Sequence, residues 1–157
     1  MYRQVEDFVQ DWQQSANGTL SVIQAITDDK LDFAIVEGHN SLGWLAWHLV
    51  GAAGAFAHFA GLTVNGIGQE DPQPTSVSEI ADTYERVANE LTEAAKSLSD
   101  ASLTEEVSSF VGPTERGRLL RGLIDHQNHH RSQMTVLLRQ VGLTVPPVMG
   151  PTKEMQK

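Results

Sequence analysis

Four long segments of the sequence repeat apolar residues every three or four positions, which is the spacing of one face of an α-helix. No segment of adequate length alternates apolar and polar residues, so the pattern does not favour a sheet. Helices are expected over about Val5 to Ile26, Leu42 to Leu62, Ser76 to Leu98, and Pro113 or Thr114 to Val141. Four long amphipathic helices with two sizeable connections predict an all-α four-helix bundle.

Several residues predict where these helices begin and end. Asn40 or Ser41 is a suitable N-cap for the second helix, and Ser76-Val77-Ser78-Glu79 has the pattern of a capping box for the third. Gly142 provides a stop for the fourth helix, while Gly18 is a weak point within the first.

The chain of 157 residues fits a single domain, expected over residues 1–157, with a proline-rich tail from about residue 143. It has no cysteine, which excludes disulfides, thiolate metal sites and a cysteine nucleophile. Any metal ion would therefore be held by histidine, carboxylate or carbonyl groups. The absence of cysteine also fits a reducing compartment, so a cytoplasmic location is expected.

The net charge of −9, from 20 acidic and 11 basic residues, indicates a surface that repels nucleic acid. Residues 41–69 carry no charge and are long enough to span a bilayer. However, its most apolar part, residues 42–62, contains two histidines and four glycines, and no Lys or Arg lies between Lys30 and Arg86 to anchor a span. The start of the chain also lacks the apolar region of a signal peptide. We therefore expect a buried core helix and no membrane or nucleic-acid partner.

Half of the six histidines lie in "DHQNHHRSQM", residues 125–134. His126 and His130 are four residues apart and share a helix face, whereas His129 points away from that face. In the second helix, His48 lies at the edge of the apolar stripe. Inward histidines are commonly hydrogen-bonded core residues, but three neutral imidazoles can also hold one metal ion with a position left open. An open position is typical of catalytic rather than structural zinc.

The spacing therefore predicts metal ligands at His48, His126 and His130. For His129, Arg131 and Gln133 two interpretations stay open: groups that support the ligands from behind, or solvated surface. Trp44, one turn before His48, could form a wall of the pocket or pack in the core. Motifs of zincin proteases, carboxylate di-iron bundles, nucleotide-binding loops and serine hydrolases are absent from the sequence.

"HNSLGWLAWHLVGAAGAF" and, about 75 residues later, "LIDHQNHHRSQMTVLLRQVGL" resemble the DinB/YfiT-like superfamily, as does the closing "PPVMGPT". The resemblance covers nearly the whole chain. It implies an up-down-down-up bundle, a dimer, and a divalent metal such as zinc or nickel. By motif position the ligands would be His48, His126 and His130.

The resemblance also implies a range of activities, because its characterised members include enzymes that depend on a low-molecular-weight thiol. Three classes stay open for this chain. The first is a metal-dependent S-transferase or isomerase that uses such a thiol on a small molecule. The second is a metal-dependent hydrolase, and the third is a non-catalytic metal-binding or stress-response protein. Nothing in the residues separates the first two.

The second helix is apolar on both faces, so it needs cover on every side. Opposite its main stripe lie residues without any charge: Trp47, Val50, Gly51, Gly54, Ala57 and His58. In a four-helix bundle this face is expected to be uncovered. The natural cover is a second copy of the chain, which predicts a homodimer.

Overall fold

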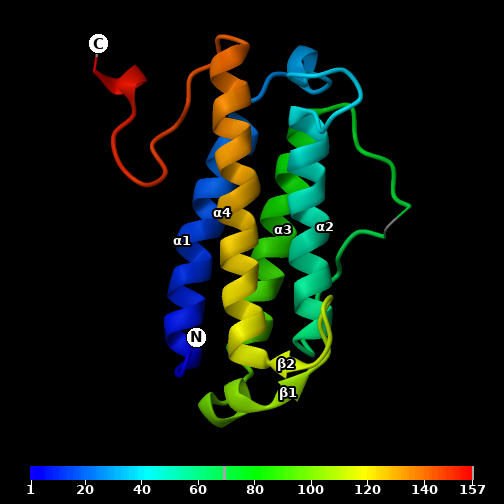
Figure 1. The fold of residues 1–157 in the computed structure, drawn as a ribbon, viewed down its shortest axis with the longest axis vertical. Coiled ribbons are helices and arrows are strands. Elements are labelled where there is room, and N and C mark those ends of the chain that lie inside the picture. The colour runs from blue at the N-terminus through cyan, green and yellow to red at the C-terminus, as the bar shows by residue number, and fades with distance from the viewer. Residues whose placement is uncertain (69, 157) are drawn as a thin grey trace.

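The computed structural model describes residues 1–68 and 70–156 and confirms the all-α four-helix bundle. Its main helices are α1 (Val5–Gln24), α2 (Leu42–Phe59), α3 (Val77–Ala95) and α4 (Arg116–Gln140). Figure 1 shows α1 and α4 running in one direction and α2 and α3 in the other, which is the up-down-down-up arrangement. Single-turn helices are η1 (Asp28–Lys30), η2 (Asp100–Thr104) and η3 (Lys153–Met155).

The core lies along the axis of the bundle. α1 packs against α3 and α4, and α2 packs against the same two helices, so α1 and α2 lie diagonally across the bundle. Burial of their apolar stripes is the main source of stability, at roughly 25 cal/mol per Å² of apolar surface. The largest fully buried side chains include Phe8, Trp12, Ile23, Leu45, Leu49, Ile80, Tyr84, Leu91, Leu120 and Leu123.

The predicted helix ends differ from the structure by a few residues. α2 ends at Phe59 and α3 at Ala95, each three residues before the expected position. The expected start of α4 is wrong because residues 114–115 form a strand, β2 (Thr114–Glu115). It pairs antiparallel with β1 (Glu106–Val107), and α4 begins directly after it. Two residues a strand are too few for an alternating pattern to reveal.

The helix caps give a mixed outcome. Ser41 caps α2 as predicted, because its Oγ accepts a hydrogen bond of 3.1 Å from the backbone N–H of Trp44. Ser76 precedes α3, but its side chain makes no capping bond. The backbone N–H of Val77 instead donates to Oδ1 of Asp28 over 2.8 Å, so the predicted capping box is wrong. Gly142 ends α4 as expected, with a φ of 76° that favours glycine.

The chain itself covers much of the α2 face that was expected to be free. Val50 and Ala57 are fully buried within one chain, which contradicts their placement on an outer face. The connection after α2 covers another part of this face. Its backbone approaches α2 so closely that a Cβ added at Gly54 would lie 3.1 Å from Cα of Gly66. Figure 1 shows this connection running along the outside of α2. Among the helices of the described residues, none is long and apolar enough to cross a membrane.

Candidate metal centre

The three predicted histidines meet between α2 and α4. His48 comes from α2, and His126 and His130 lie one turn apart on α4; all three side chains are partly buried. Each offers one ring nitrogen, and these nitrogens lie within 4.8 Å of one another. The structure thus brings together all three predicted ligands. It leaves His129 outside the group, on the exposed side of α4.

The spacing of the nitrogens suits a divalent ion. Nε2 of His48 and Nε2 of His126 are 3.3 Å apart. Two nitrogens that each bind one tetrahedral zinc at about 2.05 Å lie roughly 3.3 Å from each other. His126 packs beside Phe56, with 5.7 Å between the ring centroids. Its Nδ1 is buried without a hydrogen-bond partner among the described residues, so the ring is oriented by packing and by the contact of its Nε2 with His48.

Gln133 fixes the orientation of His130. Nδ1 of His130 lies 2.9 Å from Oε1 of Gln133. Because an amide oxygen can only accept, Nδ1 carries the proton and Nε2 keeps its lone pair for a metal ion. The Nε2 amide of Gln133 in turn donates to Nε2 of His129 over 3.2 Å. Gln133 therefore contacts one of the predicted ligands on the side away from the other two, as one of its two open interpretations requires.

Trp44 packs on His48 and is not part of the core, and it does not line the cavity beside the histidines. Its indole stacks on the imidazole of His48, with ring centroids 4.8 Å apart and an interplanar angle of 9°. The side chain remains 41% exposed. The stacking restricts rotation of His48 about its side-chain bonds and shields one face of the ring from water.

Both interpretations of Arg131 were wrong, because it is buried and points toward α1. Its Nη1 donates to the backbone oxygen of Ser15 over 2.7 Å and contacts Oγ1 of Thr19 at 3.3 Å. Arg131 follows Leu123 and Gln127 at four-residue spacing, so all three share one face of α4. That position within an apolar face was the signal that could have identified it as a buried residue.

Gln127 joins the two helices that carry the histidines. Its Oε1 accepts bonds from the hydroxyls of Thr19 (3.1 Å) and Tyr84 (2.9 Å), and its Nε2 donates to the backbone oxygen of Leu49 (3.3 Å). Leu49 directly follows His48, and Gln127 directly follows His126. This fully buried amide therefore fixes α2 against α4 at the level of the histidines. The sequence analysis did not identify it, because its partners come from three other helices.

The surroundings of His48 and His126 keep these two imidazoles neutral. Burial, followed by the charge of His130, lowers the pKa of His48. Burial, followed by the charges of His130 and His48, lowers the pKa of His126 to about 4. Both effects disfavour the protonated ring. Near neutral pH the lone pairs of both residues are thus available to a metal ion.

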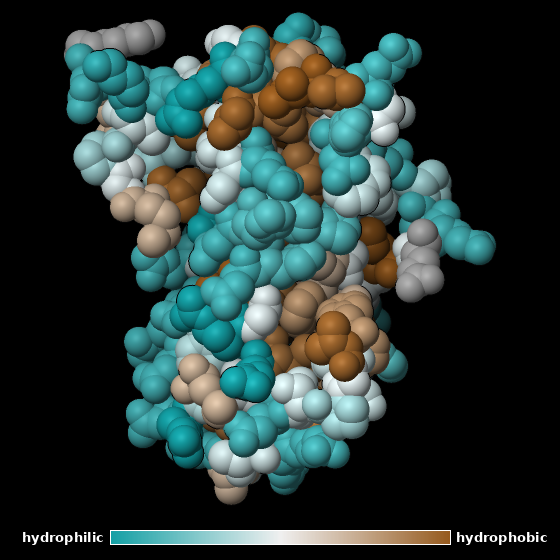
Figure 2. Space-filling view, viewed as in Figure 1, coloured by the Kyte–Doolittle hydropathy of each residue, from teal (hydrophilic) through white to brown (hydrophobic). Residues whose placement is uncertain are grey.

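A cavity of about 1060 Å³ opens beside the histidines, with His48 and His126 in its wall. It extends along the outer side of α2 to residues 66–68 and Asp71 of the following connection, and to Phe110, which lies between β1 and β2. Figure 1 shows the loop between these strands rising beside the end of α2. Figure 2 shows apolar surface set back between α4 and α2 in the lower half of the molecule. A bound ion would thus face a space that is large enough for a small molecule.

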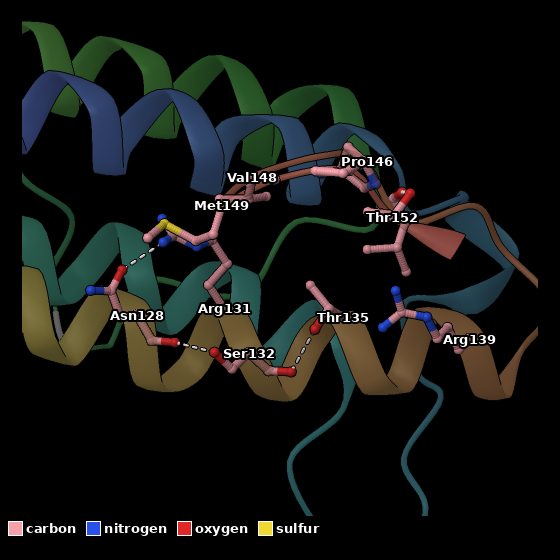
Figure 3. A pocket seen from close by; sticks show the side chains of 12 residues that line it. Asn128, Arg131, Ser132, Thr135, Arg139, Pro146, Val148, Met149 and Thr152 are labelled. Atoms are coloured by element: carbon pink, nitrogen blue, oxygen red, sulfur yellow. Dashed lines mark hydrogen bonds between the residues drawn. The ribbon is translucent and has the colours of Figure 1, made fainter. Parts of the chain in front are cut away.

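A second cavity, of about 570 Å³, lies between α4 and the C-terminal tail (Figure 3). Its two cations already have partners: Arg131 bonds to α1, and Nε of Arg139 lies 2.9 Å from Glu154. No histidine lines it among the described residues. The histidines that could bind a metal ion therefore lie at the first cavity.

Comparison with known proteins assigns the family. The sequence profile of the DinB family matches residues 1–157. A Bacillus subtilis (strain 168) protein named YrdA, itself uncharacterized, is 39% identical over 155 residues, covering 98% of this chain and 93% of its own.

Solved structures agree with this assignment. The crystal structure of a DinB-like protein from Bacillus cereus ATCC 10987 superimposes with a TM-score of 0.89 at 41% identity, covering 94% of this chain and 99% of that one. YjoA, a DinB-like protein from Bacillus subtilis, shares the fold with a TM-score of 0.73 at 18% identity, covering 92% and 99%. This chain, with three histidines that can bind a metal ion, belongs to the DinB family.

Proposed function

We propose that this protein is a metal-dependent enzyme that uses a low-molecular-weight thiol to act on a small molecule, as an S-transferase or isomerase. One observation carries the proposal: three imidazole nitrogens from two helices lie within 4.8 Å of one another at the wall of a large cavity. Zinc and nickel are the metals proposed, because both accept imidazole ligands.

The side chains around such a site have different roles. His48, His126 and His130 are neutral donors, so they leave a divalent ion its full charge. When bound, the ion stabilises a thiolate, or a hydroxide formed from water, near neutral pH. Gln133 holds the proton of His130 on Nδ1, and Trp44 covers one face of His48. The cavity receives the small molecule next to the histidines.

Cobalt substitution tests the proposal. The wild-type protein loaded with Co²⁺ is expected to show the visible bands of a four-coordinate ion, and a small thiol should add a thiolate-to-metal band in the near ultraviolet. His129→Ala should behave as the wild type, while His126→Ala should lose both signals. A site that binds cobalt but gives no thiolate band, and instead hydrolyses esters, would support the hydrolase. A site that takes up no cobalt would contradict metal-dependent catalysis altogether.

We further propose that the protein acts in the cytoplasm and as a homodimer. The lack of cysteine supports the first point. Large apolar side chains that remain exposed, including Trp44, Ile35 (64%) and Val36 (53%), support the second. The face of α2 opposite its main apolar stripe does not support a homodimer, because the chain itself buries Val50 and Ala57 there.

A further inference from the structure

We infer that the cavity beside the histidines selects small molecules whose part beyond the metal is uncharged and aromatic. This rests on the proposed function only in taking the cavity as the substrate site. Its wall carries three aromatic rings close together. Phe110 lies with its ring centroid 4.9 Å from that of Phe56 and 4.7 Å from that of Phe59. All three line the cavity, together with Trp47.

The width of the cavity comes from small residues on α2. Gly51, Ala52 and Ala55 line this side, where larger side chains would fill the space, and Gly54 allows the backbone of Gly66 to approach α2. Ligand cavities commonly measure about 300–1000 Å³, so a volume of about 1060 Å³ exceeds the need of water or a bare thiol. A substrate with a one- or two-ring aromatic group therefore fits beside the histidines.

The charges around the cavity disfavour anions. Among the described residues that line it, none is Lys or Arg, whereas Asp71 is at its rim. The Asp71 carboxylate accepts a bond of 2.7 Å from the backbone N–H of Gly68, which holds its negative charge in place. An anionic substituent away from the metal would lose water without gaining a cationic partner. The net charge of −9 acts in the same direction.

Phe110 is the residue most suited to determine this preference. It comes from the connection between β1 and β2, and it is 58% exposed while its ring covers Phe56 and Phe59. An aromatic ligand in the cavity can pack against these rings. Its neighbour Val111 is 95% exposed and does not line the cavity, so it provides a matched control.

Two probes with the same ring system test the inference: 2-naphthalenemethanol, and its analogue with a carboxylate on the far ring. Binding is measured by NMR titration, both on metal-loaded wild type and on His126→Ala without metal. The neutral probe is expected to bind at least about 10-fold more tightly to both proteins, because the carboxylate must be desolvated without a partner. Phe110→Ala should weaken the neutral probe by about 10-fold through lost ring contacts, while Val111→Ala should change nothing. Ala55→Lys, which places a cation in the wall, should reduce or reverse the preference.

The outcomes separate this inference from the proposed function. Equal binding of the two probes to His126→Ala, binding unaffected by Phe110→Ala, or no binding of either probe would overturn the inference. A wild-type protein that rejects metal yet keeps the preference for the neutral probe would contradict the proposed function and leave the inference standing.

Discussion

The hydrogen bond between His130 and Gln133 determines which nitrogen of His130 faces the other two histidines. Without it the ring can change tautomer or rotate, and such partners typically contribute about 10- to 100-fold to metal affinity. We therefore expect Gln133→Leu to weaken zinc binding by about 10-fold or more while the fold is kept. Competition with a chromophoric chelator measures the effect. His129→Ala is the control, since His129 contacts Gln133 but lies outside the group; equal affinity in all three proteins would contradict this role.

His126 makes the stability of the metal-free protein depend on pH. Its pKa is about 4 in the folded state and near 6.5 in the unfolded chain. Between these values the unfolded state binds more protons, so the free energy of unfolding falls as pH falls from about 6.5 towards about 4. His48, whose pKa is also lowered, acts in the same direction.

Urea unfolding of the metal-free protein at about pH 7.5 and about pH 5 measures this dependence. The wild type should be clearly less stable at the lower pH, and His126→Gln should lose part of that difference. A wild type with the same stability at both values, or a His126→Gln protein with the full difference, would show that His126 is not held neutral by its surroundings.

At the scale of elements, Gly18 couples α1 to the C-terminal tail. α1 continues through Gly18 without a break, so this glycine does not weaken the helix enough to interrupt it. Its role is instead to leave space for the tail. A Cβ added there would lie 2.5 Å from Cγ1 of Val148 and 3.2 Å from Nη1 of Arg131. We expect Gly18→Ala to displace the tail, although alanine alone favours a helix by about 0.5–1 kcal/mol over glycine.

Hydrogen exchange of residues 143–152 measures this displacement, and it should be faster in Gly18→Ala. Gly122→Ala in α4 is the control, because a Cβ there would make only an ordinary contact of 3.5 Å with Phe56. Unchanged exchange in Gly18→Ala would mean that the tail packs on α1 without needing the glycine.

The helices could be predicted because each carries its own apolar stripe, which is a local property of the sequence. The ends of helices depend on distant partners and were less accurate. Asp28 caps α3 from 49 residues away, and β2 exists only through its pairing with β1. The two inward histidines of α4 could be predicted from their four-residue spacing. The position of Arg131 on an apolar face of α4 could have indicated its burial, but the partners of Gln127 and Arg131 could not be predicted, because other helices supply them.

At the scale of the whole molecule, the cavity and the cover of α2 depend on where the connection after α2 runs. Its composition indicates a loop but not its path, so the sequence analysis left the α2 face free and missed the cavity. The convergence of His48 with the other two histidines also depends on which helices are neighbours. The positions of the histidines around each helix predict that they face inward. They lie together in one site because α2 packs against α4.

The proposed homodimer is a property of the whole molecule that one chain does not determine. Light scattering at micromolar concentration is expected to give about twice the 17.2 kDa mass of a single chain. The mass of one chain would contradict the proposal. Substitution of Val50 is unsuitable as a test, since Val50 is fully buried and its loss would disturb the core.

The measurement that tests the central claim most directly is the metal content of the protein purified without chelators or an affinity tag. It compares the wild type with single alanine variants of His48, His126, His130 and His129. The account predicts about one divalent ion for each wild-type chain and for His129→Ala, and a sharp loss in each of the other three, because two imidazoles hold an ion much less tightly than three. Equal occupancy in His129→Ala and His130→Ala, or a wild type that rejects added zinc, nickel and cobalt, would contradict it.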